Sequence, residues 1–94
     1  MADAVVRNEE LSRYEITVGG RLAGVADFRV SPDGTVILPH TQIETGMQGR
    51  GLGARLVRAA LDDLRSAGRR VDPQCWYVAQ FIDENPSYKD LLAG

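Results

Sequence analysis

Apolar and polar residues alternate along the first half of the chain, which is the pattern of strands that bury one face. Two adjacent glycines, Gly19 and Gly20, interrupt this pattern and favour a tight hairpin turn, since both central residues of such a turn take a positive φ. The segment Ser-Pro-Asp-Gly at 31–34 indicates a second turn. The strands we expect are residues 4–7, 13–18, 21–30 and 35–44. The first half therefore predicts an antiparallel meander.

After Gly46 the hydrophobic period changes from two to about 3.6 residues, which indicates an amphipathic helix. Arginines and aspartates lie between the apolar positions and are expected to face away from the core. Arg58 and Asp62 have the spacing of an ion pair on a helix surface, and Gly68 lies where a left-handed residue would end the helix. The apolar stripe consists of Leu52, Leu56, Val57, Ala60, Leu61 and Leu64.

The remaining residues predict a short strand at 70–72 that stops at Pro73, a second helix at 75–84, and a last turn at 87–92. No repeat, linker or low-complexity tract divides the sequence. A chain of 94 residues buries a modest share of its surface and has room for one core. We therefore expect a single domain over residues 1–94 of the α/β (α+β) class, with helices packed on a mainly antiparallel sheet.

Composition places the protein among ordinary globular proteins, with 44% hydrophobic and 26% charged residues. No apolar run approaches the roughly 20 residues that span a bilayer, so we expect no membrane segment. The first seven residues lack the basic and then apolar layout of a secretory signal, and the single cysteine, Cys75, cannot form an internal disulfide. These features predict a cytoplasmic protein.

A formal net charge of −2 argues against general nucleic-acid binding, which needs clustered positive charge. The arginines are nevertheless unevenly distributed, and one stretch holds Arg50, Arg55, Arg58, Arg65, Arg69 and Arg70. This cluster is either a local anion site or the solvated face of a helix. Both interpretations stay open at this point.

The glycine-rich stretch from Gln48 to Ala54 lies between the fourth strand and the first helix. Glycines let backbone N–H groups approach an anion, and the start of a helix adds unsatisfied donors and the positive end of its dipole. A phosphate or pyrophosphate is the ligand that suits these features. The alternative is that the glycines serve a simple loop or close packing.

Three known phosphate-binding patterns contain glycines like those of this stretch. A P-loop needs Gly-Lys-Ser or Gly-Lys-Thr, which the chain lacks. A dinucleotide fingerprint is matched superficially by Gly49, Gly51 and Ala54 with Asp72 downstream, but that fold needs several parallel strands that alternate with helices. The third pattern, Gln-x-x-Gly-x-Gly of acyl-coenzyme A-dependent acetyltransferases, suits a meander followed by a loop and a helix.

From Tyr14 to Leu91 the chain resembles a known family, the small GNAT-like N-acetyltransferase domain proteins. His-Thr-Gln-Ile at 40–43 is similar to the family's His-Thr-Glu-Val, and Asn-Pro-Ser-Tyr-Lys-Asp-Leu at 85–91 is similar to its His-Pro-Glu-Tyr-x-Asp-Leu ending. Several separate matches in the right order are stronger evidence than the glycines alone. The further matches are residues 48–53, residues 56–61, and Val71-x-Pro73-x-Cys75 with Val78.

The resemblance implies a cofactor, acetyl-coenzyme A, and a place for it. The fourth and fifth strands would splay apart with pantetheine between them, and backbone groups around Ile43 would pair with it. Arg50 would either add charge to the phosphate site or be solvated. The pyrophosphate would be held by N–H groups of the loop residues Gln48, Gly49, Arg50, Gly51, Leu52, Gly53 and Ala54.

Acetyl transfer requires a deprotonated amine, a polarised thioester and a stabilised leaving thiolate. Larger relatives use a carboxylate on the fourth strand and a tyrosine on a later helix, but here Gln42 stands where the carboxylate is frequent. His40, whose ordinary titration range suits a base, and Glu44 are the alternatives. His40 is also open to the interpretation that strand neighbours hold it.

The later helix lacks the usual asparagine and tyrosine spacing, but Cys75 matches the family's cysteine. At a helix start its thiolate would be favoured, which suits a nucleophile, whereas a lone free cysteine is most often a small buried hydrophobe. Tyr77 and Tyr88 are candidate proton donors, and Tyr88 is the one expected to pack the C-terminal segment. Trp76 replaces a proline that is common in the family.

Other site chemistries fit poorly, because one cysteine and one histidine do not form a closed zinc site and no serine lies in a Gly-x-Ser-x-Gly context. We therefore expect acetyl-coenzyme A binding and acetyl transfer to an amine, with Cys75 and His40 as the catalytic candidates and no metal. The alternative is a non-catalytic coenzyme A-binding or interaction module. The sequence lacks the helices that larger relatives insert after their first strand to cover the acceptor site, so we expect an open acceptor groove, which suits a protein or peptide amine or a site that a partner completes.

Overall fold

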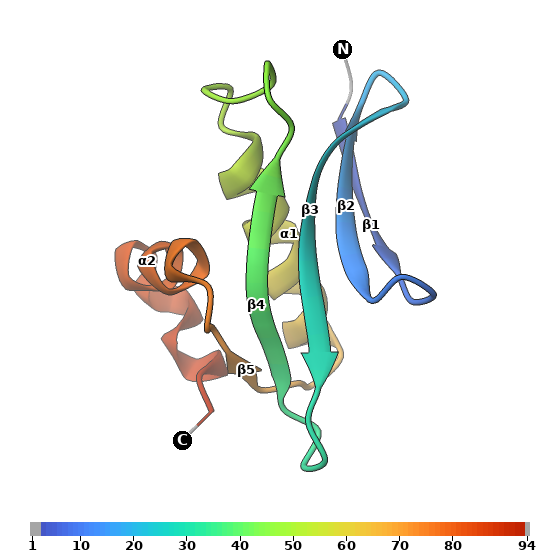
Figure 1. Ribbon diagram of the computed structural model, residues 1–94. Coiled ribbons are helices and arrows are strands. Elements are labelled where there is room, and N and C mark those ends of the chain that lie inside the picture. Colours follow the sequence, from blue (N-terminus) through green and yellow to red (C-terminus); the bar gives the residue numbers. More distant parts are fainter. Residues whose placement is uncertain (1–2, 94) are drawn as a thin grey trace.

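The structure is a computed structural model that describes residues 3–93. Its first half is the predicted antiparallel meander, in which each strand pairs with the next one along the chain (Figure 1). Alternating apolar residues direct one face of each strand toward the core, and Tyr14, Ile16, Ala26 and Phe28 are buried there. The strands are β1 (Asp3–Asn8), β2 (Arg13–Val18), β3 (Arg21–Val30) and β4 (Val36–Ile43).

The two predicted turns are confirmed. Gly19 and Gly20 take φ values of 57° and 80° between β2 and β3, so both central residues of this hairpin use the left-handed region that glycine tolerates. At the second turn, between β3 and β4, the Asp33 carboxylate accepts hydrogen bonds from the Ser31 hydroxyl and the Thr35 N–H. These bonds lower the pKa of Asp33.

An irregularity in β4 decides which way its second half points. Asp27 lies opposite His40 while Arg29 lies opposite Ile37, so β4 contains one residue more than β3 over this interval. Leu38, before the irregularity, is buried in the core, whereas His40, after it, is exposed on the outer face of the sheet. The sheet therefore presents a polar patch at this end of β4.

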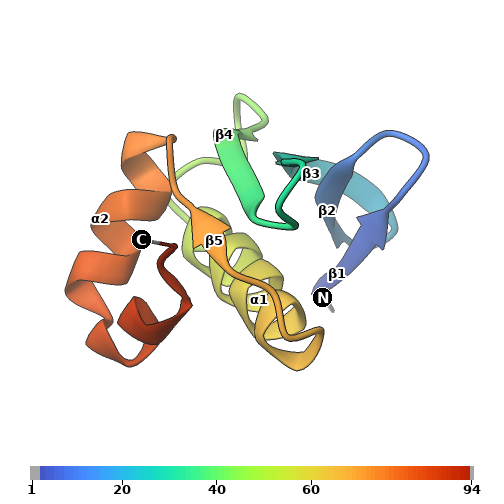
Figure 2. The ribbon, with the colours of Figure 1, turned by 90° about the horizontal axis from the view of Figure 1, so that it is seen from below.

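Helix α1 (Leu52–Ser66) packs against the concave side of the sheet, which curls around it (Figure 2). Its buried residues are the six of the predicted apolar stripe, so that prediction is confirmed. Gly68 takes a φ of 70°, and its N–H and that of Arg69 donate to carbonyls of the last helical turn. This is the glycine-dependent helix end that the sequence predicted.

The last part of the chain contains β5 (Val71–Asp72), α2 (Trp76–Glu84) and the 3-10 helix η1 (Pro86–Leu91). β5 pairs in parallel with β4 at one edge of a five-stranded sheet, so the sheet is mixed but mainly antiparallel. The predicted elements are thus present in order, with the helix beginning at Trp76 rather than Cys75. Neither helix in the described range 3–93 is long and apolar enough to cross a membrane.

Adjacent carboxylates on α1 bind tyrosines from two directions. Asp63 accepts a hydrogen bond of 2.7 Å from the Tyr14 hydroxyl on the sheet, and Asp62 accepts one of 2.6 Å from the Tyr88 hydroxyl on η1. Burial and then the neighbouring aspartate raise the pKa of each tyrosine above its ordinary value. The expected packing role of Tyr88 is confirmed.

The predicted ion pair between Arg58 and Asp62 is wrong. Asp62 is engaged by Tyr88, and the Arg58 guanidinium lies over the Phe81 ring at 5.2 Å from its centroid. Local spacing brought the two charges within reach, but α2 and η1 pack against this face of α1 and offer both residues other partners. The arginine face is therefore partly an interface between the two halves of the fold.

Candidate functional site

A wedge opens between β4 and β5, as the family resemblance implied. The two strands pair only at Val36 with Val71 and at Ile37 with Asp72, and the Cys75 N–H then donates to the Leu38 carbonyl at 2.9 Å. Beyond this bond β4 continues to Ile43 with no strand of the described residues paired on that side, while the chain turns away into α2. The wedge encloses a pocket of about 550 Å³, whose walls come from β4, the β4–α1 loop and the start of α2.

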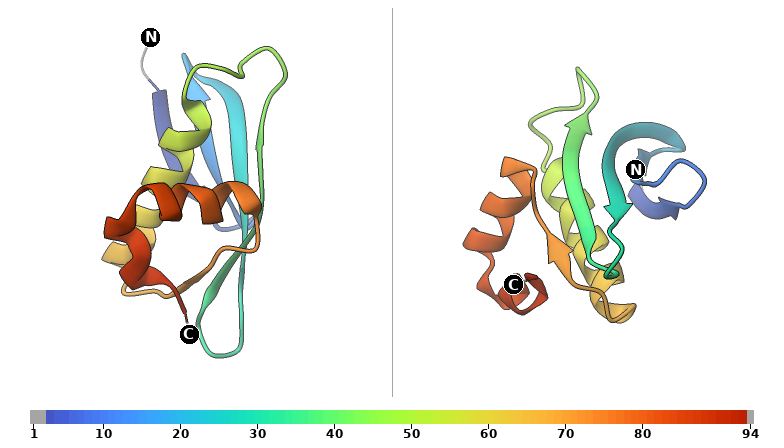
Figure 3. Two further views of the ribbon diagram at one scale, coloured as in Figure 1. Left: turned by 90° about the vertical axis from the view of Figure 1, so that its left-hand side faces the viewer. Right: turned by 60° about the horizontal axis from the view of Figure 1, so that its bottom comes forward.

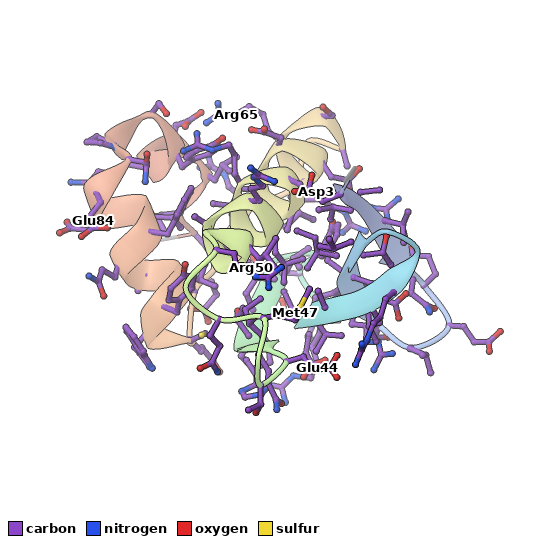
Figure 4. The ribbon with its side chains drawn as sticks, turned by 90° about the horizontal axis from the view of Figure 1, so that it is seen from above. Asp3, Glu44, Met47, Arg50, Arg65 and Glu84 are labelled. Carbon is purple, nitrogen blue, oxygen red and sulfur yellow. The ribbon has the colours of Figure 1, made fainter. Side chains whose placement is uncertain are left out.

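The β4–α1 loop offers backbone donors to this pocket. Within residues 3–93, no backbone N–H from Gln48 to Ala54 donates to a protein acceptor. The loop ends at Gly51, the N-cap of α1, so the last of these groups are the orphan donors at the positive end of the helix dipole. Figure 4 looks onto this loop, with Met47 and Arg50 labelled on it. The arrangement can bind an anion.

The three glycines of the loop serve different purposes. Gly49 and Gly51 have φ values of 82° and 73°, and a Cβ on either would meet nothing within 4 Å, so their backbone conformation requires glycine. Gly53 has no such φ, but a Cβ there would lie 2.8 Å from the Tyr77 hydroxyl oxygen. Close packing, which was one of the two interpretations of these glycines, is the structural reason for Gly53.

The opposite wall of the pocket carries the catalytic candidates. Cys75 is the N-cap of α2, is 8% exposed, and has its Sγ 3.7 Å from the Thr41 hydroxyl oxygen. His40 is exposed at the outer side, with Nε2 at 3.4 Å from the Gln42 side-chain oxygen. Cys75 and His40 both line the pocket, so the structure brings together the two residues that the sequence singled out.

Most, but not all, of the predicted cofactor-binding residues line the pocket. Arg50 is exposed on the loop and does not line the pocket, and Ala54 lines a neighbouring groove instead. Glu44, the further candidate base, forms an ion pair with Arg21 at 3.5 Å. The other predicted loop and strand residues line the pocket: Ile43, Gln48, Gly49, Gly51, Leu52 and Gly53.

Sequence reasoning missed several lining residues. Thr41 lay inside the motif that suggested the family but received no role, and Tyr77 was considered only as a proton donor. The alternation of β4 could have identified Thr41, because it shares a face with Ile43. The additional lining residues are Pro39, Thr41, Met47, Gln74, Trp76 and Tyr77. Among the described residues, no three His, Cys, Asp or Glu side chains form a cluster that could hold a metal ion.

Known proteins resemble the chain in sequence. The sequence model of the GCN5-related N-acetyl-transferase family matches residues 13–91. Protein NATD1 of Bos taurus is 39% identical over 51 residues, which are 54% of this chain and 45% of that protein. Protein NATD1 of Xenopus tropicalis is 35% identical over 52 residues, 55% of this chain and 48% of that protein. The chain thus spans about half the length of these curated relatives.

Solved structures resemble the fold. A GCN5-like putative N-acetyltransferase from Staphylococcus aureus superposes with a TM-score of 0.72 at 17% identity, covering 97% of this chain and 88% of that one. Ribosomal-protein-alanine N-acetyltransferase from Brucella melitensis biovar Abortus 2308 superposes with a TM-score of 0.55 at 17% identity, covering 87% of this chain and 61% of that one. The family match, which includes the loop and both pocket walls, agrees with this fold. The chain belongs to the GCN5-related N-acetyl-transferase family.

Proposed function

We propose that the protein binds acetyl-coenzyme A in the pocket between β4 and β5 and transfers the acetyl group to an amine. The observation that carries this proposal is the wedge that ends at a loop of free backbone donors. A ligand with an extended arm and a pyrophosphate matches that shape, and membership of an acetyltransferase family supports the chemistry.

Each part of the cofactor has a partner in this arrangement. The amides of pantetheine would pair with the free edge of β4 in the manner of an added strand. The Ile43 carbonyl now accepts a weak hydrogen bond, 3.4 Å, from the Gln48 side chain, which the ligand would replace. The pyrophosphate would lie on the N–H groups from Gln48 to Ala54, where the dipole of α1 favours negative charge.

The acceptor would approach from the outer face of the sheet, which no helix within residues 3–93 covers (Figure 3). A shallow groove of about 150 Å³ lies on that face beside Val25, Gln42 and Glu44. Its exposed position suits a protein or peptide acceptor, as the sequence led us to expect.

In the proposed reaction the neutral amine attacks the thioester carbonyl carbon, the C–S bond breaks, and its electron pair leaves with the coenzyme A sulfur. His40, at the outer side of the pocket, is the candidate that takes the proton from the attacking nitrogen. The thiolate receives a proton from Tyr77 or from water. Within the described part of the chain the Tyr77 hydroxyl has no hydrogen-bond partner, which leaves it free for this step.

An alternative mechanism and an alternative function each have a specific basis in the sequence. Cys75 could first take the acetyl group by attacking the thioester, release coenzyme A, and pass the group to the amine. A non-catalytic coenzyme A-binding module is favoured by Gln42, since an amide cannot replace the carboxylate base. Consumption of the thioester in the presence of an amine separates an enzyme from a binding module.

The test combines calorimetry and mass spectrometry. Coenzyme A and acetyl-coenzyme A are titrated into the protein, and masses are then recorded with and without a panel of amines and peptides. We expect binding of both cofactors and an acetylated amine. Absence of binding would refute the proposal, whereas binding without consumption of the thioester would leave the non-catalytic module.

A matched pair of variants tests the phosphate loop. Gly51→Ala and Gly68→Ala place a Cβ at nearly the same φ, 73° and 70°, at opposite ends of α1 and with nothing within 4 Å. Each should lose about 1–2 kcal/mol of stability through strain. Only Gly51→Ala should bind coenzyme A more weakly, and equal affinities would argue against a phosphate at this loop.

A further inference from the structure

We propose that the groove between α1 and α2 binds the adenosine 3′-phosphate part of coenzyme A, with adenine stacked on Trp76 and the 3′-phosphate next to Arg58. This inference rests on the proposed function, since it assigns the nucleotide end of the same ligand. The groove has a volume of about 410 Å³ and shares Trp76 and Tyr77 with the pocket in the wedge. A ligand that leaves the wedge past the phosphate loop therefore enters the groove directly.

Trp76 offers an unused stacking surface at the junction. Its side chain is 73% exposed, the highest exposed fraction among the large apolar side chains of the described residues. The Trp76 and Tyr77 rings are nearly perpendicular, at 5.8 Å between ring centroids and 82° between planes, so Tyr77 does not stack face to face on the indole. Exposed aromatic faces are what nucleobases stack on.

Arg58 supplies a cation with no carboxylate partner. In the part of the chain that the structure describes, every arginine except Arg29, Arg50 and Arg58 contacts a carboxylate or carbonyl oxygen. Arg50 lies on the phosphate loop and Arg58 lines the groove. Coenzyme A likewise carries its charge in two places, the diphosphate and the 3′-phosphate.

The spacing along α1 agrees with this assignment. Ala54 and Arg58 line the groove one helical turn apart, which is about 6 Å along the axis. One ribose separates the two phosphate positions of the ligand, so a diphosphate on the loop leaves the 3′-phosphate at about that distance. Stacking over Phe81 fixes the Arg58 guanidinium on the groove side of the helix.

The groove is also lined by an acidic residue, Glu84, whose distance from the proposed phosphate position decides whether it opposes binding. Glu84 lies at the far end of α2, about 12 Å along the helix axis from Trp76. The Gln80 amide donates to its carboxylate at 3.2 Å. Asp62, the carboxylate nearest to Arg58 in sequence, is engaged by the Tyr88 hydroxyl. Arg58 lies over Phe81 and therefore between Trp76, at the phosphate-loop end of the groove, and Glu84, at its far end.

Trp76 is the only tryptophan of the chain, so its fluorescence reports directly on the proposed stack. Coenzyme A, 3′-dephospho-coenzyme A and acetyl-4′-phosphopantetheine are titrated into the wild-type protein while fluorescence and heat are recorded. We expect both nucleotide ligands to quench the emission and the phosphopantetheine to bind without quenching it. Dephospho-coenzyme A should bind about threefold to tenfold more weakly than coenzyme A.

Variants assign the two contacts separately. Trp76→Ala should weaken coenzyme A binding about 5- to 100-fold. Arg58→Gln should remove the preference for coenzyme A over the dephospho form, whereas Arg29→Gln, which removes a positive charge of β3 outside the groove, should keep it. These comparisons use affinity ratios within one variant, so a small change in its stability does not affect the result.

The outcomes distinguish the inference from the proposed function. Coenzyme A binding with unchanged fluorescence, or a 3′-phosphate preference that survives Arg58→Gln, overturns the groove assignment and leaves the proposed function standing. Quenching by phosphopantetheine equal to that by coenzyme A also overturns it, because Trp76 would then report on the pantetheine arm. Failure of every ligand to bind refutes both.

Discussion

Replacing Gly53 with alanine should displace the Tyr77 side chain while changing the stability of the fold only slightly. The new Cβ would lie 2.8 Å from the Tyr77 hydroxyl oxygen and 3.1 Å from the ring carbon that carries it. Neither distance is tolerable without movement. Because these atoms are the free end of a half-buried side chain, we expect the Tyr77 ring to move rather than α1.

The opposing contributions to stability are similar in size. Alanine is favoured over glycine in a helix by about 0.8–1.0 kcal/mol, and a displaced side chain costs about 0.5–1.5 kcal/mol. The free energy of unfolding should therefore change by less than about 1 kcal/mol. Acetyl transfer, in contrast, should fall by about tenfold or more if Tyr77 is the proton donor, because its hydroxyl would leave the place from which we propose that it protonates the thiolate.

The assay pairs urea unfolding with steady-state kinetics in Gly53→Ala, Tyr77→Phe and the double variant. On the Tyr77→Phe background the 2.8 Å contact is absent while the ring carbon still lies 3.1 Å from the new Cβ, so the second change should cost less stability than it does beside Tyr77 and should lower kcat no further. Equal effects of Gly53→Ala on kcat in both backgrounds would refute this reasoning, as would a loss of several kcal/mol of stability with a normal rate.

Three further expectations concern single side chains. Tyr14→Phe removes the hydrogen bond to Asp63 and should lower the free energy of unfolding in urea by about 1–2 kcal/mol. Since the folded state raises the pKa of Tyr14 above its ordinary value of 10.0, this contribution is present below pH 10 and declines as the pH rises further, and the variant should show a shallower alkaline decline. Cys75→Ala should keep transfer within about tenfold of the wild type, because removing a group that only lines the pocket should slow transfer far less than removing a nucleophile. An acetyl adduct on Cys75 by mass spectrometry, with loss of transfer by orders of magnitude in the variant, would contradict direct transfer. His40→Ala should slow transfer by about 10²- to 10⁴-fold, the usual contribution of a general base, and an unchanged rate would exclude His40 as the base.

Features of the fold that depend on near neighbours could be predicted from the sequence. The alternation in residues 13–18, the apolar stripe of α1 and the glycine at its end are local patterns, and the structure confirms them. The Arg58–Asp62 pair was wrong because local spacing competes with tertiary partners. Phe81 and Tyr88 reach α1 only after the chain has folded back, and the sequence of residues 52–66 does not identify them as partners.

The candidate site likewise combines features that local sequence predicts with features that depend on distant residues. The loop and its helix start were predictable because both lie in one stretch of sequence. The outward position of His40 could not be read from the alternation of β4, because an extra residue in β4 before His40 puts it on the opposite face from Leu38. The reason for Gly53 could not be read locally either, because the side chain that requires it, Tyr77, lies on another element. A glycine that lets a phosphate approach and a glycine that lets a phenol ring approach look the same in the sequence.

The paired bonds from Tyr14 and Tyr88 to α1 have a consequence for hydrogen exchange. α1 is held from the sheet side through Asp63, while the segment that carries Cys75, Trp76 and Tyr77 is held by buried side chains of α2 and η1, by polar contacts from α1 and by the short pairing of β5. Because this segment has only two residues of strand pairing with the sheet, we expect it to open before the meander and α1. Its amides should exchange before those of α1, and a ligand that touches both walls of the pocket should slow them most.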